Sequence, residues 1–213
     1  MSIPPYQLYL FDIDGTLLDS ATDICTAVRQ TLEAEGATGL TDEYLRSFIG
    51  YHLEELFSEV FPGITKERSA ELLAKYRATY LARAHASTRV FAGVPEMLAG
   101  LRGLKSTATT KGSETSRSVL EKFGLIGHFD HVQGTDGFPS KPAPDVILKS
   151  LEKFGVAPEN CLLIGDSAPD MEAGRRAGVR TCGVAWGYGD AQEMRAHEPD
   201  YWIDNPRELV AQG

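Results

Sequence analysis

The regular alternation of strand-like and helix-like segments after Phe91 is the feature that most restricts the folds open to this chain. Strand-like runs occur at residues 104–110, 129–136, 160–166, 180–187 and 200–204, with helix-like segments between most of them. Strands that alternate with helices form parallel crossover units, in which the helices pack against the sheet. Together with the buried apolar run at residues 8–11, this pattern predicts an α/β fold with a doubly wound, mostly parallel sheet.

Residues 17–91 differ from the rest of the chain because they are helix-like and contain no convincing strand signal. One helix is expected over about residues 20–35 and a long one within residues 65–87, where apolar residues recur at helical spacing. The domain organisation follows from this difference. We predict a core domain made of residues 1–16 and 92–213, interrupted by a helical domain that occupies residues 17–91.

Composition restricts the class of protein further. With 213 residues, of which 42% are hydrophobic, the chain can bury a substantial core. Its formal charge of −9 and the lack of a Lys/Arg cluster argue against nucleic acid as a partner. No apolar run approaches the roughly 18 residues of a membrane span, and the first residues do not resemble a secretory signal. We therefore expect neither a membrane nor a nucleic-acid partner.

The three cysteines bear on the cellular compartment. Cys25, Cys161 and Cys182 are widely separated and have no metal-type spacing. We interpret them as reduced thiols, in preference to a disulfide between two of them, and expect a cytoplasmic protein. A monomer and a homodimer fit the sequence equally well.

Polar side chains are expected where several strands end, which is where ligands bind in doubly wound sheets. These residues are Asp12 and Asp14, Thr109 and Thr110, and Asp166. Lys141 precedes the helix that leads into the strand at residues 160–166. Asp12 and Asp14 would project on the same side of an extended chain, where like charges repel one another and burial increases the cost. A divalent cation bound by Asp12 and Asp166 together would relieve this repulsion, and an oxygen-rich site of this kind suits Mg²⁺.

The segment "DIDGTLLDS", which begins at Asp12, resembles the first signature of the haloacid dehalogenase superfamily of phosphatases. Three further signatures match in order: Thr109 in "STATTKGS", Lys141 in "SKPAPD", and Asp166 with Asp170 in "IGDSAPDMEAG". The four motifs extend over most of the chain, and the helical stretch stands where one branch of the superfamily carries a helical cap domain. Within that branch, the chain is most similar to phosphoglycolate phosphatase-like enzymes.

The resemblance implies a role for each motif residue. Asp12 would attack the phosphorus of a phosphomonoester and form an aspartyl-phosphate, while Asp14 would protonate the leaving oxygen and later accept a proton from water. The pair then needs environments that separate the two pKa values. Thr109 would hydrogen-bond the transferring phosphoryl group, assisted by the backbone N–H of Thr110. Lys141 would neutralise charge on the phosphoryl oxygens and on Asp12.

The resemblance also implies a Mg²⁺ cofactor. Asp12 and Asp166 would bind the ion through their side chains, whereas Asp14 would contribute only its backbone carbonyl and keep its carboxyl free for proton transfer. Asp170 would be a further ligand or would orient a metal-bound water. An acid at this position also stabilises the start of a helix, so a structural role for Asp170 is equally compatible with the sequence.

Other motif residues have alternatives as well. Either Thr109 or Thr110 can supply the motif hydroxyl, because the polar run around them leaves the strand register open. Lys111 competes with Lys141 for the role of the phosphate-binding lysine, although its spacing fits less well. Asp19 and Ser20 are expected to cap the first helix of the helical domain.

The helical domain is where substrate selection is expected in this family. Tyr51 and His52, in "FIGYHLEELF", match the loop that faces the phosphate site when such a domain closes, and are the candidate substrate contacts. The alternative is that they are surface residues, which a lone His and Tyr at a helix start more often are. Hinges are expected near residues 17–19 and 91–93, where closure would exclude water from the site.

Several other functions share parts of this pattern. A response-regulator receiver, a binding module, also gathers acids, a Thr and a Lys, but is typically shorter and lacks a helical insertion. A true haloacid dehalogenase normally lacks the second acid, Asp14. A phosphomutase of the β-phosphoglucomutase type tends to carry paired acids where this chain has Gly165-Asp166. A phosphonate hydrolase would need a lysine in the helical domain, where Lys66 and Lys75 are the candidates.

We therefore predict a Mg²⁺-dependent hydrolase of a small phosphorylated metabolite, with phosphoglycolate as the leading substrate. The alternatives within the superfamily are a sugar-phosphate phosphatase or phosphomutase and a pyrophosphatase. The alternative from a different class is a non-catalytic phosphate-binding or phosphoacceptor regulatory protein.

Overall fold

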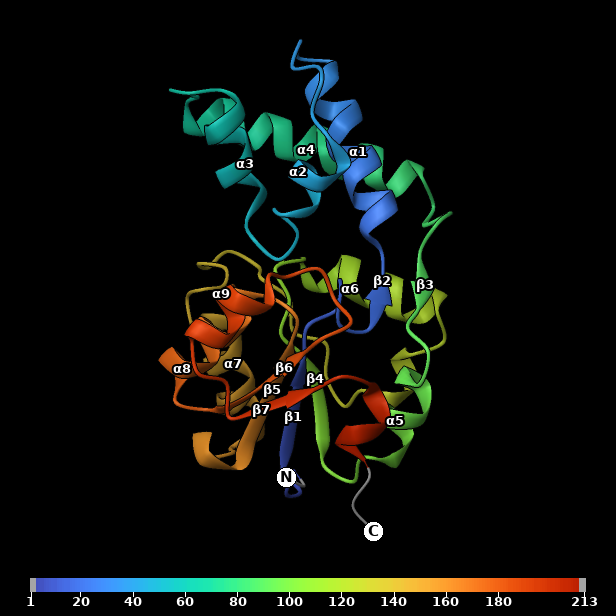
Figure 1. The fold of residues 1–213 in the computed structure, drawn as a ribbon, viewed down its shortest axis with the longest axis vertical. Helices are drawn as coiled ribbons and strands as arrows, with labels where there is room; N and C mark the ends of the chain where they lie inside the picture. The colour runs from blue at the N-terminus through green and yellow to red at the C-terminus, as the bar shows by residue number, and fades with distance from the viewer. Residues whose placement is uncertain (1–2, 211–213) are drawn as a thin grey trace.

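A computed structural model describes residues 3–210 and contains a five-stranded parallel sheet with helices on both faces (Figure 1). The strands are β1 (Leu8–Phe11), β4 (Leu104–Thr107), β5 (Cys161–Gly165), β6 (Arg180–Val184) and β7 (Tyr201–Ile203). Their order across the sheet is β4-β1-β5-β6-β7, and every neighbouring pair is parallel. The predicted α/β fold with a doubly wound parallel sheet is confirmed.

Alternating side chains of β1 supply the two faces of this core. Leu8 and Leu10 pack in a cluster with residues of the helices α7 and α8, whereas Tyr9 and Phe11 pack with residues of α5 and α6. The helices of this part are α5 (Val94–Gly100), α6 (Ser113–Lys122), α7 (Asp145–Phe154), α8 (Ala168–Ala177) and α9 (Ala191–Ala196). Because β1 lies between β4 and β5 with both faces covered, the residues that follow it are held by rigid neighbours.

The stretch predicted to be a helical domain forms four helices beyond the carboxyl ends of the sheet strands (Figure 1). These helices, called the four-helix segment below, are α1 (Ala21–Glu33), α2 (Asp42–Arg46), α3 (Leu53–Val60) and α4 (Lys66–Ala82). They enclose a hydrophobic cluster of their own. The domain boundaries at residues 16/17 and 91/92 stay a prediction, and residues 1–2 and 211–213 of the predicted core lie outside the described residues.

A short two-stranded antiparallel sheet connects the four-helix segment to the larger sheet, where the sequence predicted no strand. β2 (Leu18–Asp19) pairs with β3 (Arg89–Val90), so the chain enters and leaves the segment side by side. Strands of two residues are too short for side-chain periodicity to reveal them. The expected hinges at residues 17–19 and 91–93 overlap or adjoin this ribbon.

Two further elements differ from the sequence prediction. The expected strand at residues 129–136 is reduced to one bridge between Ser106 and His131. The Thr107 hydroxyl accepts from the Gln133 N–H and donates to its carbonyl, both at 2.8 Å, so a side chain replaces the backbone ladder. The helix α9 was not predicted, because six residues show little periodicity, although Asp190 caps it by accepting from two backbone N–H groups.

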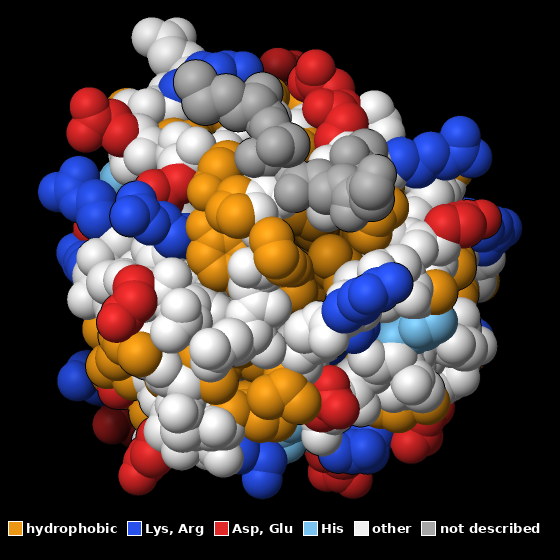
Figure 2. Space-filling model, turned by 90° about the horizontal axis from the view of Figure 1, so that it is seen from below, with side chains coloured by type: hydrophobic (Ala, Val, Ile, Leu, Met, Phe, Trp, Pro, Cys, Tyr) orange, Lys and Arg blue, Asp and Glu red, His pale blue; other side chains and the backbone are white. Residues whose placement is uncertain are grey.

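Three features of the described residues relate to the predicted partners and cellular compartment: the lengths of the helices, the state of the cysteines and the distribution of surface charge. Within residues 3–210, no helix is long and apolar enough to cross a membrane. All three cysteines are buried free thiols, as expected, and the cytoplasmic location stays a prediction. Figure 2 shows the end opposite to the four-helix segment, where basic and acidic side chains are interspersed rather than gathered into a basic patch.

Candidate active site

The register of the central strands brings Asp12 and Asp166 together. Phe11 of β1 pairs with Ile164 of β5, and the Asp12 N–H continues the ladder by donating to the Ile164 carbonyl at 2.9 Å. Each aspartate follows the end of its strand, and each is only 3% exposed. Residues more than 150 positions apart in sequence therefore meet at the edge of the sheet nearest the four-helix segment.

Asp170 completes a buried group of three carboxylates with Asp12 and Asp166. One oxygen from each lies within 4.8 Å of the other two. Burial, together with repulsion within the group, raises the pKa of Asp12 to about 6 and that of Asp166 to about 8. Three carboxylate oxygens in this arrangement are a donor set that fits a hard divalent cation such as Mg²⁺, which would remove the repulsion.

Lys141 is the cation that the structure places inside this group. The side chain is fully buried, with Nζ at 3.0 Å from Asp12 Oδ1 and in an ion pair with Asp170 Oδ1. Burial alone would lower the pKa of Lys141, but the two carboxylates outweigh it and the pKa is raised. Lys141, rather than Lys111, therefore lies beside Asp12, as its spacing predicted.

Both oxygens of Asp170 are engaged by the chain itself. Oδ1 pairs with Lys141, while Oδ2 accepts from the Ser167 N–H at 3.1 Å and from its hydroxyl at 2.5 Å. The Ser167 and Asp170 side chains form a reciprocal capping box at the start of α8. The structural role left open by the sequence is therefore present, and Asp170 also holds Lys141 in place.

Asp166 is fixed by two residues that the sequence analysis did not select. Thr16 Oγ1 donates to it at 2.8 Å and the Tyr188 N–H donates at 2.9 Å. Gly15 has a φ of +89°, and a Cβ there would lie 2.0 Å from an Asp166 oxygen, so only glycine fits against this carboxylate. Thr16 could have been noticed because it follows Gly15 in the first motif, whereas no local signal links Tyr188 to Asp166.

Asp14 has partners different from those of Asp12. The Ser20 hydroxyl donates to Asp14 Oδ1 at 2.5 Å, and Lys111 forms an ion pair with Oδ2. Ser20 does occupy the N-cap position of α1, but its side chain makes no capping hydrogen bond there, which differs from the prediction. Asp19 also fails to cap the helix, because it accepts from the Tyr188 hydroxyl at 2.7 Å.

The two threonines lie in the loop after β4, since that strand ends at Thr107 rather than at residue 110. Thr109 is 1% exposed; its hydroxyl accepts from the Lys111 N–H at 3.3 Å, and its carbonyl accepts from Thr135 at 2.9 Å. Thr110 lines a cavity that also exposes Asp12. Which of the two hydroxyls contacts a phosphoryl group stays a prediction.

This cavity, about 180 Å³ in volume, lies between the sheet and the four-helix segment. Asp12, Asp14, Thr110 and Lys111 line it on the sheet side, and residues of α1, α4 and the loop before α3 line it on the other. It therefore brings three of the predicted site residues on the sheet side, together with Lys111, to one solvent-accessible space.

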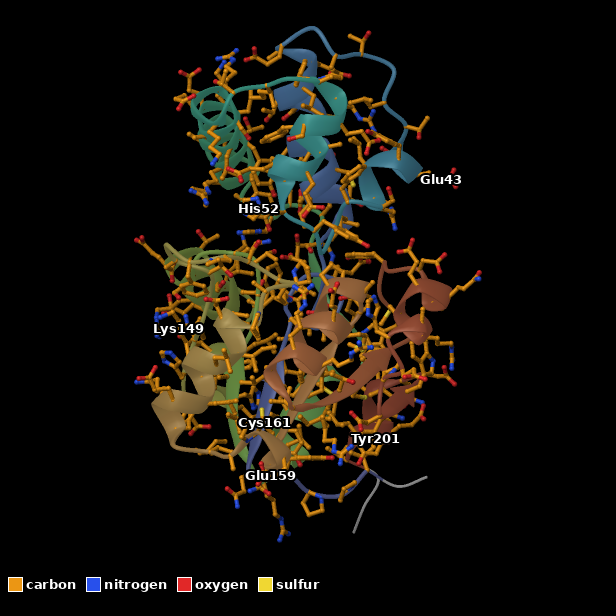
Figure 3. The ribbon with its side chains drawn as sticks, turned by 90° about the vertical axis from the view of Figure 1, so that its left-hand side faces the viewer. Glu43, His52, Lys149, Glu159, Cys161 and Tyr201 are labelled. Carbon is orange, nitrogen blue, oxygen red and sulfur yellow. The ribbon has the colours of Figure 1, made fainter. Side chains whose placement is uncertain are left out.

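Tyr51 and His52 line the same cavity. His52 lies on the edge of the four-helix segment that faces the sheet, whereas Cys161 and Tyr201 lie toward the far end of the core (Figure 3). The Tyr51 hydroxyl is 3.4 Å from Glu193 Oε2, and His52 Nδ1 is 3.4 Å from Glu54. Burial and the nearby Glu193 raise the pKa of Tyr51. The loop prediction is thus correct in position, and substrate contact stays a prediction.

The four-helix segment is also held to the core at two points beside the site. The Tyr188 hydroxyl accepts from the backbone N–H groups of Ser20 and Ala21 at 2.6 and 3.0 Å. Gly50, with a φ of +99°, lies so close to Ser167 that a Cβ would be 2.8 Å from the serine Cβ. Both contacts join a loop of the core to the four-helix segment or to the residue just before it, and Gly50 also lines the cavity.

Comparison with known proteins agrees with the motifs. The profile of the haloacid dehalogenase-like hydrolase family matches residues 9–184. A phosphoglycolate phosphatase of Aquifex aeolicus is 34% identical over 96% of this chain and 95% of its own length. A 5'-nucleotidase of Pseudomonas aeruginosa is 32% identical over 92% of this chain and 90% of its own. The crystal structure of a predicted phosphatase from Clostridium acetobutylicum superposes with a TM-score of 0.90 at 27% identity, covering 97% of each chain.

Proposed function

Because this chain belongs to the haloacid dehalogenase-like hydrolases, we propose that it is a Mg²⁺-dependent phosphatase that cleaves a small phosphomonoester through an aspartyl-phosphate at Asp12. One observation carries the proposal. Asp12 and Asp14 line the same cavity, yet Asp12 contacts the buried Lys141 whereas Asp14 contacts Ser20 and Lys111. Two neighbouring carboxylates with different partners fit a nucleophile and a proton-transfer group.

In the first step, an Asp12 oxygen forms a bond to phosphorus while the bond from phosphorus to the leaving oxygen breaks. Asp14, protonated for this step, gives its proton to the leaving oxygen. In the second step, water attacks the phosphorus, Asp14 takes the proton of that water, and the bond to Asp12 breaks to release phosphate. Lys141 offsets negative charge on the phosphoryl oxygens throughout, and Ser20 orients the Asp14 carboxyl.

The three-carboxylate group would hold the Mg²⁺ ion, with Asp12 and Asp166 as side-chain ligands and the Asp14 carbonyl as a further candidate. When bound, the ion would supply charge stabilisation to the phosphoryl oxygens. Asp170 already contacts Lys141 and Ser167 through its two oxygens. We therefore assign Asp170 first to the positioning of Lys141, and only second to the metal.

The relatives direct the choice of substrates to test. Phosphoglycolate is the first candidate because it is in the name of several relatives, and a 5'-nucleotide is the second. A phosphonate hydrolase is disfavoured, since neither Lys66 nor Lys75 is among the described residues that line the cavity. Lys75 instead pairs with Glu35 on the surface of the four-helix segment.

Phosphate release from a panel of phosphomonoesters, with Mg²⁺ or with EDTA, tests the proposal. We expect metal-dependent release that Asp12→Asn lowers by about a thousandfold or more, as for removal of a nucleophile in other hydrolases. Asp204→Asn, an exposed aspartate outside the cavity, is the matched control and should retain full activity. Full activity in Asp12→Asn would contradict the mechanism, and the absence of release from the whole panel would contradict the assignment as a phosphatase.

A further inference from the structure

The wall that the four-helix segment contributes to the cavity is mostly apolar. Its side chains include Ile24 of α1, Phe48 in the loop before α3, Leu53 of α3, and Leu73, Tyr76 and Tyr80 of α4. The three α4 residues recur at helical spacing, so they form one continuous face of that helix. This face lies across the cavity from Asp12 and Asp14, where the group attached to a bound phosphate would extend.

Two tyrosines give this wall an aromatic surface. The rings of Tyr76 and Tyr80 are stacked, with centroids 5.8 Å apart and an angle of 24° between their planes. Tyr80 is only 3% exposed, and its hydroxyl has no hydrogen-bond partner among the described residues. Buried tyrosine hydroxyls usually have a partner. The wall therefore has an aromatic part, formed by the largely buried rings of Tyr76 and Tyr80, with the Lys111 ammonium 4.9 Å from the centroid of the Tyr80 ring.

The described lining of the cavity contains no buried, unpaired cation for a second anionic group on the substrate. Among its described lining residues, Lys111 and Arg77 are the Lys and Arg side chains. Lys111 is paired with Asp14, and Arg77 is exposed on α4. In the resting protein the half-buried Lys111 is already engaged by Asp14, and the apolar side chains beside it cannot solvate a carboxylate such as that of phosphoglycolate.

We infer that the cavity selects phosphomonoesters whose leaving group is aromatic, in preference to short hydrophilic hydroxy acids. The inference rests on the proposed function, because it concerns the leaving group of that same reaction. Apolar pockets with a few polar groups bind flat apolar ligands well, and an aromatic leaving group adds contacts with the parts of Tyr76 and Tyr80 that line the cavity. Asp12 and Lys141 would still bind the phosphoryl group in the same way.

The test compares kcat/KM in the presence of Mg²⁺ for benzyl phosphate and phosphoglycolate, both of which have an alkyl oxygen as the leaving atom. The wild-type protein should favour benzyl phosphate by at least about tenfold. Leu73→Asn should lower kcat/KM for benzyl phosphate by about tenfold, mainly through KM, and change that for phosphoglycolate by less than about twofold. Leu148→Asn, at a leucine that is 45% exposed and outside the cavity lining, should change neither.

Two further variants keep the test decisive. Leu81 also lines the cavity and is 56% exposed, so Leu81→Asn should fold normally and shift the preference in the same direction, even if Leu73→Asn folds poorly. Arg77→Gln, one helical turn from Leu73, tests the opposite hypothesis, in which the cavity prefers phosphoglycolate and depends on the charge of Arg77 for this preference. Preferred cleavage of phosphoglycolate that Arg77→Gln abolishes would overturn the inference and leave the proposed function intact. The lack of Mg²⁺-dependent release from either substrate would overturn both.

Discussion

The strand ends and the four-helix segment line one cavity, but they contribute different kinds of groups to it. The strand ends and the core residues packed beside them supply buried charges in fixed pairs, of which Lys141 with Asp12 and Asp170 is the clearest example. The four-helix segment supplies mostly apolar side chains and a loop that contacts the core at Gly50 and Tyr51. Chemistry therefore depends on sheet register, which is rigid, whereas substrate selection depends on helix faces and a loop, which can vary without disturbing the charges.

If the charges of the core carry the chemistry, the largest effect on activity should come from Lys141→Met. This substitution keeps the side-chain length but removes the charge. We expect kcat to fall by about 100- to 1,000-fold, the range found when one preorganised charge-stabilising group is lost. The control is Lys149→Met, on the exposed side of α7 (Figure 3). Near wild-type kcat in Lys141→Met, measured with the best substrate of the panel, would show that the buried lysine has a structural role alone.

The second prediction concerns Mg²⁺ binding, measured by calorimetry with the metal alone. Asp166→Asn should weaken binding by at least about tenfold, because it removes one of the two proposed side-chain ligands. Asp170→Asn should have the smaller effect, since its carboxylate already contacts Lys141 and Ser167. Equal losses in the two variants would place Asp170 on the metal as well.

The third prediction concerns pH and stability without metal. The raised pKa values of Asp12 and Asp166 mean that the folded chain binds these protons more tightly than the unfolded chain. The contribution of these groups to the free energy of unfolding in EDTA should therefore be fully present below the ordinary aspartate pKa of 3.8. It should decrease as the pH rises above that value, until the pH has passed about 6 for Asp12 and about 8 for Asp166. A loss of at least about 1 kcal/mol is expected, since one pKa unit corresponds to about 1.4 kcal/mol.

Denaturant titrations from pH 5 to pH 9 measure this loss. Saturating Mg²⁺ should remove most of it, because the ion favours the ionised carboxylates. In Asp166→Asn, the dependence in EDTA should become shallower. The same pH dependence in EDTA for the wild-type protein and for Asp166→Asn, with Asp204→Asn as the control for loss of an exposed aspartate, would contradict the described carboxylate group.

The smallest effect is predicted where the two regions touch. Tyr188→Phe removes hydrogen bonds to the backbone at Ser20 and Ala21 and should cost about 1 kcal/mol of stability. Tyr51→Phe removes only a 3.4 Å contact with Glu193 and should lower the free energy of unfolding by only a few tenths of about 1 kcal/mol. Thermal unfolding of the two variants in parallel gives the comparison, and a larger loss in Tyr51→Phe would indicate that its loop is the main attachment.

The sequence allowed the sheet side of the site to be predicted because strand ends follow from local patterns. The apolar runs placed Asp12 and Asp166 correctly, and the parallel sheet then required them to meet. The partners of these residues depend on contacts distant in sequence, so Tyr188 beside Asp166 and Lys111 beside Asp14 were not predicted. The ribbon of β2 and β3 was missed because each strand has only two residues.

The helical side of the cavity was predictable only in outline. The motif loop identified Tyr51 and His52, but nothing local showed that Leu73 and Tyr80 of α4 face the same space. Their orientation is fixed by the packing of α4 against α1, which is a tertiary property. The identity of the leaving group therefore could not be inferred from the motifs, which describe only the phosphate.

The central claim is that the phosphoryl group passes through Asp12. The most direct measurement mixes the enzyme, Mg²⁺ and its best substrate, stops the reaction with acid within the first turnover, and locates any phosphoryl group by tandem mass spectrometry. The account predicts a phosphorylated Asp12 that is absent from Asp12→Asn and that decays as phosphate is released. Phosphate release at the same rate with no modified Asp12 at any time, or with a phosphoryl group on another residue, would contradict it.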